Sequence, residues 1–371
     1  MKYSIEISKI IEGALKFDRS KVLNYSKLLI NKLELDEDLK AAKKLSNLLE
    51  KTSESQLTQM NVGNLFKSPV DSESRISMAD IIMPTSNVEI VLSEKNYKEI
   101  DTFLLSYENA DKLYSLGIDF SNTMLMYGPP GCGKTKSAFY IASKLNLPLI
   151  VARLDSMISS YLGTTAKNIR NLFEYAQKTP CVLFLDEFDA IAKARDDNNE
   201  LGELKRVVNS LLQNIDALGK NTILIAATNH EELLDKAIWR RFNYKLCIDF
   251  PGKETRKKLI NMYIKNIVTF EDKELNMLAI ATSKMSGSEI EEIINKSIQK
   301  AIIYQYDLKI YHIFNEIFEL KLEVQKDNDL KEVTKEKVRY LRGLDEKVFS
   351  YSVIGLILNI SKTQVSYIIN N

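Results

Sequence analysis

The chain has 371 residues and a net charge of +1, from 51 Lys and Arg against 50 Asp and Glu. That length allows two or three domains with a real core, and the balanced charge excludes a protein that coats nucleic acid over its whole surface, while permitting a local basic patch. Three separated cysteines and two histidines exclude a disulfide framework or a zinc pattern. No apolar run reaches the roughly 20 residues that cross a bilayer and no signal-peptide core is present, so we expect a cytoplasmic protein with no membrane partner.

The first predicted unit is a helical module over residues 1–56. Three segments repeat apolar residues at helical spacing, and acidic turns such as DEDL separate them. Two interpretations remain open, namely an appendage that only packs and a docking module for partners or substrates. Residues 57–78 are polar, contain Gly and Pro, and are predicted to form a linker.

The middle of the chain, residues 79–250, alternates short apolar runs with amphipathic helices, which predicts a parallel sheet with helices on both faces. The five predicted strands are TMLMY, LPLIVARL, CVLFLD, TILIAATN and KLCIDF. Residues 251–326 are predicted to form a helical lid, and residues 327–371 a charged connector followed by two short helices. The expected fold class is therefore α/β, with a five-stranded parallel sheet and helical domains before and after it.

One glycine-rich segment, GPPGCGKT, fits the pattern G-x-x-x-x-G-K-[ST] between a predicted strand and a predicted helix. Glycines let backbone N–H groups turn inward around phosphate oxygens, and a helix N-terminus favours an anion. Lys134 is expected to contact the β- and γ-phosphates, and Thr135 to offer its hydroxyl to Mg²⁺. The predicted cofactors are ATP and Mg²⁺, and the predicted binding residues are Gly128, Pro129, Pro130, Gly131, Cys132, Gly133, Lys134 and Thr135.

A second segment, CVLFLDEFDAI, places acidic residues directly after a buried strand. The carboxyl ends of strands are where ligands bind in open α/β sheets. Asp186 is expected to hold Mg²⁺ through water, and Glu187 is the candidate base that polarises the attacking water. Asp189 is expected to cap or pair structurally, although a part in the site stays open.

Taken together, GPPGCGKT, LFLDEFDAI, ILIAATN and LDKAIWRRF resemble the AAA clade of the AAA+ ATPases, in order and at the family spacing. The resemblance implies ATP hydrolysis in a ring of identical subunits, expected to be a hexamer. It implies a sensor at Asn229 that orients water, and arginine fingers at Arg240 and Arg241 that reach the γ-phosphate held by a neighbouring subunit. A surface ion pair is the alternative for the two arginines.

The same resemblance places further residues near the nucleotide. The segment SGSE opens a lid helix, and Gly287 permits close approach of the backbone there, beside Ser288. Val91 and Leu92 are expected to line the adenine.

The resemblance also implies a loop that projects into the central channel of the ring. Its residues would be Tyr161, Leu162 and Gly163, which would grip an extended polypeptide through apolar contact. The alternative is that Tyr161 packs on its own helix. Residues 193–203 form either a second channel loop or an exposed turn.

The last segment, residues 352–369, resembles a helix-turn-helix. Gly355 is small where two helices cross, Asn359 suits a left-handed bend, and Ser361 suits a helix N-cap. Contact with DNA and contact with a protein partner both remain open for it. The residues expected to face outward are Lys362, Thr363, Gln364, Ser366 and Tyr367.

Two functions therefore remain. The first is a ring-forming ATPase that remodels or threads a protein substrate through a central pore. The second is a DNA-associated regulatory ATPase whose ATP-dependent assembly is directed by the C-terminal helices. A non-catalytic scaffold is disfavoured because both acidic residues and both arginines are present.

Overall fold

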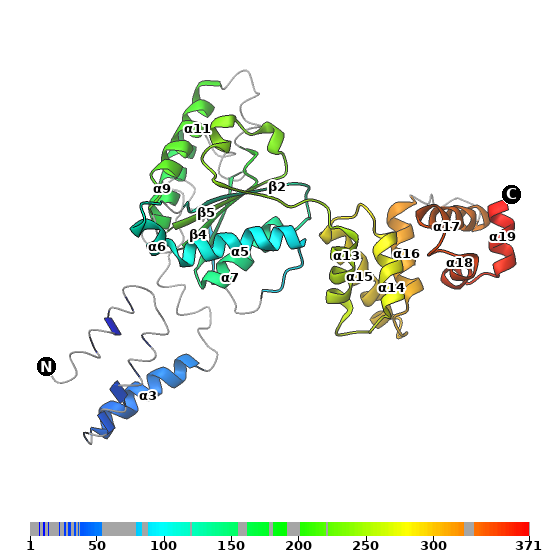
Figure 1. The fold of residues 1–371 in the computed structure, drawn as a ribbon, viewed down its shortest axis with the longest axis horizontal. Coiled ribbons are helices and arrows are strands. Elements are labelled where there is room, and N and C mark those ends of the chain that lie inside the picture. The colour runs from blue at the N-terminus through cyan, green and yellow to red at the C-terminus, as the bar shows by residue number, and fades with distance from the viewer. Residues whose placement is uncertain are drawn as a thin grey trace. The chain divides into compact units, whose positions relative to one another are not determined.

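The computed structural model describes residues 38–53, 79–83, 88–118, 121–154, 162–177, 181–190, 201–219, 222–322 and 330–370, with scattered positions between 7 and 36 (Figure 1). The chain divides into two compact units, Met1–Lys67 and Ser68–Asn371. The predicted linker at residues 57–78 lies outside the described residues.

The described part of the first unit is helical, as its apolar spacing predicts. Helix α3 runs over Leu39–Ser53, and the Asp38 carboxylate accepts a hydrogen bond from the Ala41 backbone N–H at 3.2 Å before its first turn. Leu29, Ile30 and Leu33 form a small buried cluster with Ala42 of this helix.

The second unit contains a six-stranded sheet in the order β1-β3-β4-β5-β2-β6. Strands β2 to β6 are parallel and correspond to the five predicted strands. The predicted count of five is corrected by β1, which pairs antiparallel with β3. It has three residues, too few for alternation to identify it in the sequence. The strands are β1 (Asp80–Ile82), β2 (Thr123–Tyr127), β3 (Leu149–Arg153), β4 (Cys181–Asp186), β5 (Thr222–Thr228) and β6 (Tyr244–Cys247).

Helices cover both faces of this sheet, which is why its strands are almost wholly apolar. In β4, Val182 and Phe184 pack in the cluster that contains α5 and α7, whereas Leu183 and Leu185 pack in the cluster that contains α9 and α11. Figure 1 shows the two helical layers on either side of the strands. The helices of this part are α5 (Glu94–Glu108), α6 (Ala110–Ser115), α7 (Lys134–Leu145), α9 (Leu162–Gln177), α11 (Leu201–Asp216), η1 (Glu231–Leu233) and α12 (Lys236–Trp239).

The strand order brings distant segments to one edge of the sheet. β5 lies between β4 and β2, with Leu185 opposite Ala226 and Tyr127 opposite Thr228. The chain segments that leave the carboxyl ends of these three strands are therefore neighbours, which creates the crevice expected of an open α/β sheet.

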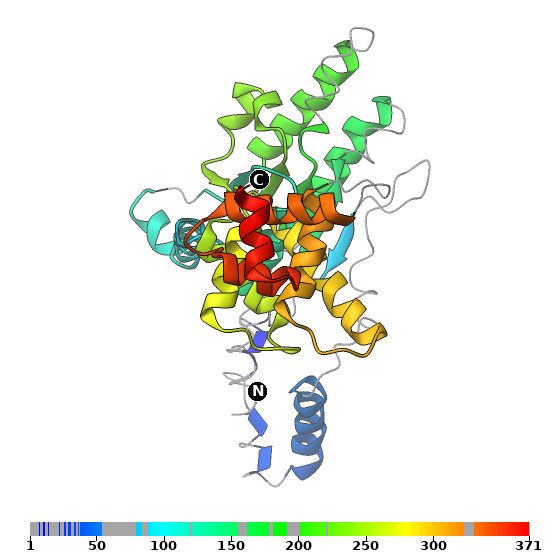
Figure 2. The ribbon, with the colours of Figure 1, turned by 90° about the vertical axis from the view of Figure 1, so that its right-hand side faces the viewer.

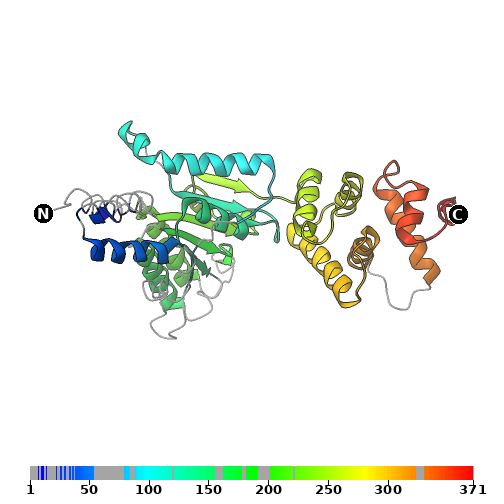
Figure 3. The ribbon, with the colours of Figure 1, turned by 90° about the horizontal axis from the view of Figure 1, so that it is seen from below.

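Residues 253–322 and 330–370 form a helical subdomain with one hydrophobic core. Phe314 of α16 meets Phe349 edge-to-face at 6.0 Å between ring centroids, and Phe318 meets Tyr340 of α17 at 6.1 Å. The predicted boundary at residue 326 therefore separates helices that share a core. Figures 1 and 3 show the order of these helices, with α17 to α19 in orange and red at the C-terminal end. The helices are α13 (Lys253–Ile264), α14 (Asp272–Ala281), α15 (Gly287–Ile303), α16 (Ile310–Lys321), α17 (Leu330–Leu344), α18 (Tyr351–Leu358) and α19 (Lys362–Asn370).

The last two helices form the turn expected from the sequence. Asn359 has φ 54° and ends α18, and the Ser361 hydroxyl accepts a hydrogen bond from the Gln364 backbone N–H at 3.2 Å. A Cβ on Gly355 would lie 2.6 Å from the Ile360 carbonyl oxygen, so no larger residue fits there without movement. Figure 2 looks onto these helices, with α19 in red. A role in DNA contact stays a prediction.

Among the described residues, no single helix combines the length and the apolar character needed to cross a membrane. Within the part of the chain that the structure describes, one helix pair, α18 and α19, reaches that length and composition when taken together, and the two helices are bent by 112° relative to one another.

Candidate active site

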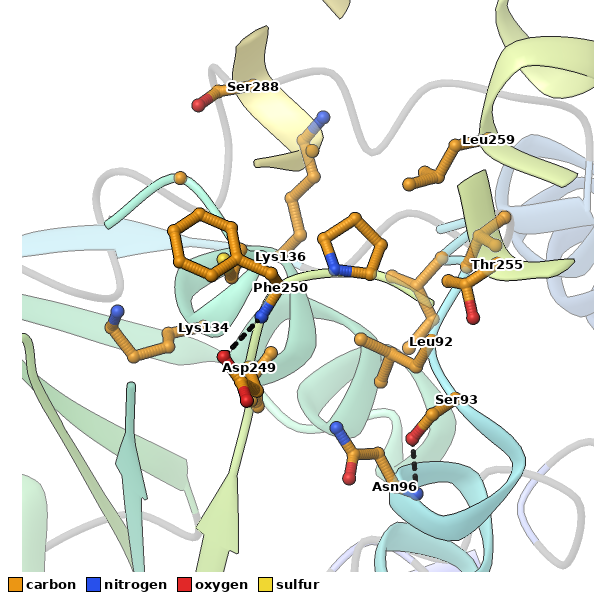
Figure 4. A pocket seen from close by; sticks show the side chains of 18 of the residues that line it. Leu92, Ser93, Asn96, Lys134, Lys136, Asp249, Phe250, Thr255, Leu259 and Ser288 are labelled. Atoms are coloured by element: carbon orange, nitrogen blue, oxygen red, sulfur yellow. Dashed lines mark hydrogen bonds between the residues drawn. The ribbon is translucent and has the colours of Figure 1, made fainter. Parts of the chain in front are cut away.

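A pocket of about 600 Å³ lies at the carboxyl ends of the central strands and is lined by residues of both the α/β part and the helical lid. Its size suits a small ligand of the nucleotide class. Figure 4 shows Leu92 and Asn96 at the lower right, Lys134 at the left, Ser288 at the top and Lys136 between them.

The predicted phosphate loop forms one wall of this pocket, between β2 and α7. Gly128 has φ 131° and Gly131 has φ 71°, conformations that side-chain-bearing residues rarely adopt. A Cβ on Gly128 would lie 2.4 Å from the Ile248 carbonyl oxygen, and one on Gly131 would lie 2.0 Å from the Ser288 hydroxyl oxygen. Glycine is therefore required at both positions by the neighbouring backbone and lid.

Lys134 is buried at the start of α7 and is aimed at its own loop. Its ammonium donates hydrogen bonds to the carbonyl oxygens of Gly128 at 2.7 Å and Pro129 at 2.8 Å. Burial lowers the pKa of Lys134, and the nearby acidic groups offset this only in part. A bound phosphate would supply the anionic partner that these neutral carbonyls do not.

The residues predicted to hold Mg²⁺ are brought together although they lie 51 positions apart in the sequence. The Thr135 hydroxyl donates to a carboxylate oxygen of Asp186 at 3.2 Å, and both residues line the pocket. One hydroxyl and one carboxylate suit Mg²⁺, which prefers oxygen ligands and keeps several waters. When bound there, the ion would neutralise charge on the phosphates. Within the described ranges, no group of three or more His, Cys, Asp or Glu side chains is arranged to hold a metal ion.

The two candidates for positioning water, Glu187 and Asn229, also line the pocket. Glu187 is exposed and has φ 53°, a conformation uncommon outside glycine. A hydrogen bond of the next residue holds this backbone conformation, because the Phe188 backbone N–H donates to the Ala227 carbonyl at 2.8 Å. A costly backbone conformation that neighbouring contacts hold in place is typical of functional sites.

Asp189 has the structural role that the sequence favours. It is buried, and its carboxylate accepts a hydrogen bond from the Thr228 hydroxyl at 3.1 Å. The same hydroxyl accepts from the His230 backbone N–H at 3.0 Å. Asp189 therefore holds the end of β5, and with it the segment that carries Asn229.

Apolar side chains also line the pocket. Val91 and Leu92, predicted to line the adenine, are among them, as are Leu259 and Met262 of α13. An apolar slot with a few polar groups is suited to a flat base.

The lid meets the phosphate loop directly at the predicted segment. Ser286 caps α15 by accepting from the Glu289 backbone N–H at 3.3 Å. The Ser288 backbone N–H donates to the Gly131 carbonyl at 3.0 Å. A Cβ on Gly287 would lie 3.3 Å from that carbonyl, so the glycine keeps the two backbones close.

Arg240 and Arg241 do not line the pocket of their own chain. Arg241 forms two contacts of 3.2 Å with the Asp216 carboxylate and also donates to the Ala237 carbonyl at 3.0 Å. In the structure Arg241 therefore forms the surface ion pair that was the alternative to an arginine finger. Arg240 is exposed at the C-cap of α12.

Tyr161 and residues 191–200 lie outside the described residues. Leu162 and Gly163 open helix α9.

Several pocket residues were not predicted from the sequence, among them Lys136, Tyr263 and Glu291. The position of Lys136 directly after the phosphate-loop motif is the one feature of the sequence from which its place in the pocket could have been predicted. Tyr263 and Glu291 lie on lid helices whose faces are assigned only by packing.

Comparison with known proteins agrees with this geometry. Residues 124–250 match the family described as ATPase family associated with various cellular activities (AAA). Over 271 residues, covering 72% of this chain and 82% of the relative, the chain is 41% identical to an uncharacterized AAA family ATPase, y4kL, of Sinorhizobium fredii.

More distant similarity links the chain to proteins named ATP-dependent zinc metalloprotease FtsH. The chain is 32% identical over 256 residues to the protein of Acaryochloris marina and 30% identical over 235 residues to that of Parabacteroides distasonis. These matches span 38% and 33% of the two relatives, and 67% and 61% of this chain. With a phosphate loop, an acidic pair and a lid contact assembled around one pocket, and with this degree of similarity to y4kL, the chain belongs to the AAA family of ATPases.

Proposed function

We propose that this ATPase assembles into a ring, expected to be a hexamer, and uses ATP hydrolysis to remodel or thread a protein substrate. The observation that carries the proposal is the composition of the pocket. The described residues that line it include Lys134, Asp186, Glu187 and Asn229 but no arginine. Since an arginine commonly stabilises the transition state of phosphoryl transfer, a neighbouring subunit is the source we assign.

Within this proposal each polar group has one task. Thr135 and Asp186 hold Mg²⁺, and Lys134 holds the β- and γ-phosphates. Glu187 accepts a proton from a water that Asn229 orients, and the oxygen of that water attacks the γ-phosphorus. The bond from that phosphorus to the bridging oxygen breaks, which leaves ADP and phosphate.

Of the two candidate fingers, Arg240 is the better placed to serve a neighbour, because it is exposed and lies away from its own pocket. Arg241 would have to leave Asp216 to act in the same way. While it is bound, its hydrogen bond to the Ala237 carbonyl ties it to α12.

The FtsH relatives are named as ATP-dependent proteases, which supports a protein as the substrate class. The matches span 38% and 33% of the length of these relatives. The proposal therefore includes remodelling and leaves out peptide-bond cleavage.

Replacing Tyr161 by Ala tests the threading step. We expect ATP turnover to stay within about twofold of wild type, because the ATP chemistry does not use this residue, while unfolding of a protein is abolished because the apolar grip is lost. Unfolding is followed with a fluorescent reporter protein that carries an unstructured extension. The matched control is Tyr304→Ala, at a tyrosine that is 71% exposed. Unfolding by Tyr161→Ala at the full rate would contradict the pore assignment.

The second candidate function, assembly on DNA, is favoured by one observation. Helices α18 and α19 are bent by 112°, within the range of a helix-turn-helix, and α19 exposes Lys362, Thr363, Gln364 and Tyr367. A protein with the tail removed is a poor test, because Val338, Phe349 and Val365 belong to the lid core.

Point substitutions on the exposed face of α19 test DNA contact instead. If α19 enters a groove of the DNA, Gln364→Ala should relax the preference for particular base sequences. Lys362→Ala should reduce the slope of log affinity against log salt concentration by about 1, the value for one lost phosphate contact. Anisotropy of labelled duplex DNA across a salt series measures both. Lys273→Ala, on the exposed side of α14, is the control. Affinity that none of the variants changes would remove α19 as the contact.

A further inference from the structure

Three side chains from three helices meet at the junction between the phosphate loop and the lid. The Lys136 ammonium lies 2.7 Å from a carboxylate oxygen of Glu291 and 3.5 Å from the Tyr263 hydroxyl. The Tyr263 hydroxyl in turn donates to the same Glu291 oxygen at 3.2 Å. Lys136 also lies 5.7 Å from the centre of the Tyr263 ring, within the range of a cation–π contact.

The position of this cluster links it to the nucleotide-binding residues. Lys136 is the residue after Thr135, so any pull on it acts on the first turn of α7, which carries the phosphate-binding groups. All three residues line the nucleotide pocket. In Figure 4 the Lys136 side chain runs from α7 toward the helix that carries Ser288.

Helix α15 is thereby held at two points one turn apart. At its first turn the Ser288 N–H donates to the Gly131 carbonyl at 3.0 Å. Three residues later, on the same face of the helix, Glu291 binds Lys136. The backbone contact fixes the N-terminus of α15 and the ion pair fixes its orientation, so the lid has little freedom to swing away while both are made.

The electrostatics favour a charged pair here. Burial would lower the pKa of Lys136, but the hydrogen bond and charge of Glu291, together with Tyr263, outweigh it and raise that pKa.

We propose that Lys136, Tyr263 and Glu291 form a latch that holds the lid on the bound nucleotide and slows its release. These are positioning residues, since they act through the orientation of α7 and α15. The latch requires nucleotide binding by this chain and is independent of ring assembly and of the substrate. Because α15 shares its core with α16, α17 and α18, the latch also connects the phosphate loop to the C-terminal helices.

The test compares Glu291→Gln and Lys136→Met with a matched control, Glu292→Gln. Glu292 is the next residue, pairs with Lys296 at 2.6 Å along the outside of α15, and does not line the pocket. Both latch variants should release a fluorescent ADP analogue about two- to fivefold faster and raise KM for ATP similarly, which is the range for a partly exposed ion pair. The control should match wild type, and kcat of the latch variants should stay within about twofold.

Charge reversal separates a latch from general stability. The double variant Lys136→Glu with Glu291→Lys should recover slow release, since the attraction is rebuilt with the signs exchanged. Thermal unfolding of the full chain without nucleotide should change little in every variant. The proposal is overturned if Glu291→Gln releases ADP like the control, if the double variant releases ADP as fast as the single ones, or if faster release is matched by an equal loss of stability without nucleotide. Failure of ring assembly would leave these binding measurements unaffected.

Discussion

Replacing Glu187 by Gln should reduce ATP turnover by about a hundredfold or more, the usual contribution of a general base, while ATP binding is retained. Gln keeps the size of the side chain but cannot accept the proton of the attacking water. The φ of 53° at this residue and the hydrogen bond from Phe188 to Ala227 do not involve the carboxylate, so the backbone should be unchanged. Phosphate release and nucleotide affinity measure the two effects.

The control for this substitution is Glu232→Gln. Glu232 is an exposed carboxylate close in sequence to Asn229, and it pairs with His230 at 3.0 Å. The Glu232→Gln variant should hydrolyse ATP at the wild-type rate. Turnover by Glu187→Gln at the wild-type rate would remove Glu187 from the role of base, whereas loss of ATP binding would mean that it holds the nucleotide.

Mixing extends the same experiment to the proposed ring. Arg240→Ala subunits should also bind ATP without hydrolysing it, because they lack the charge offered to a neighbour. In a mixed ring, the pocket of an Arg240→Ala subunit can meet the intact arginine of a Glu187→Gln subunit, so partial activity should return. Mixtures as inactive as their components would show that Arg240 does not act between subunits.

Replacing Phe349 by Ala should destabilise the whole helical subdomain by about 3–5 kcal/mol, as for other buried aromatic truncations. Phe349 is fully buried and packs edge-to-face on Phe314 of α16. The cavity would lie between the lid and the C-terminal helices. Hydrogen exchange should therefore show lower protection in α14 and α16 as well as in α17 to α19.

The matched control is Leu356→Ala, because Leu356 of α18 is 71% exposed and exposed truncations change stability little. Loss of protection confined to α17–α19 in the Phe349 variant would mean that the tail folds as a separate module. Loss across the subdomain would mean that the lid helices and α17–α19 fold as one unit.

Local patterns in the sequence were sufficient for the five parallel strands, the phosphate loop and the position of the acidic pair after β4, but not for the three-residue strand β1. Strands buried on both faces are continuous apolar runs, and β2, β4 and β5 are therefore predicted nearly to the residue. The motif GPPGCGKT has a fixed order because only glycine tolerates the conformations at Gly128 and Gly131. Asn359 and Ser361 mark the last turn for similar local reasons.

Contacts between helices distant in the sequence could not be read in this way. The union of lid and tail depends on Phe314 meeting Phe349, and the apolar spacing of each helix is equally compatible with two separate cores. The pairing of Arg241 with Asp216 likewise joins side chains from two elements. The sequence alone does not distinguish which of Arg240 and Arg241 is in an ion pair and which is an arginine finger.

By itself, the sequence determined that this chain is an α/β ATPase of the AAA type, because the buried strands and the phosphate loop are each set within a short segment. It also predicted which residues bind phosphate, hold Mg²⁺ and position water. Only the tertiary structure decided that Lys136, Tyr263 and Glu291 meet and that the lid continues into the tail. The physical reason is that packing in three dimensions decides which side chains of different helices meet. Helical spacing in the sequence identifies the buried face of each helix but not the element that packs against it.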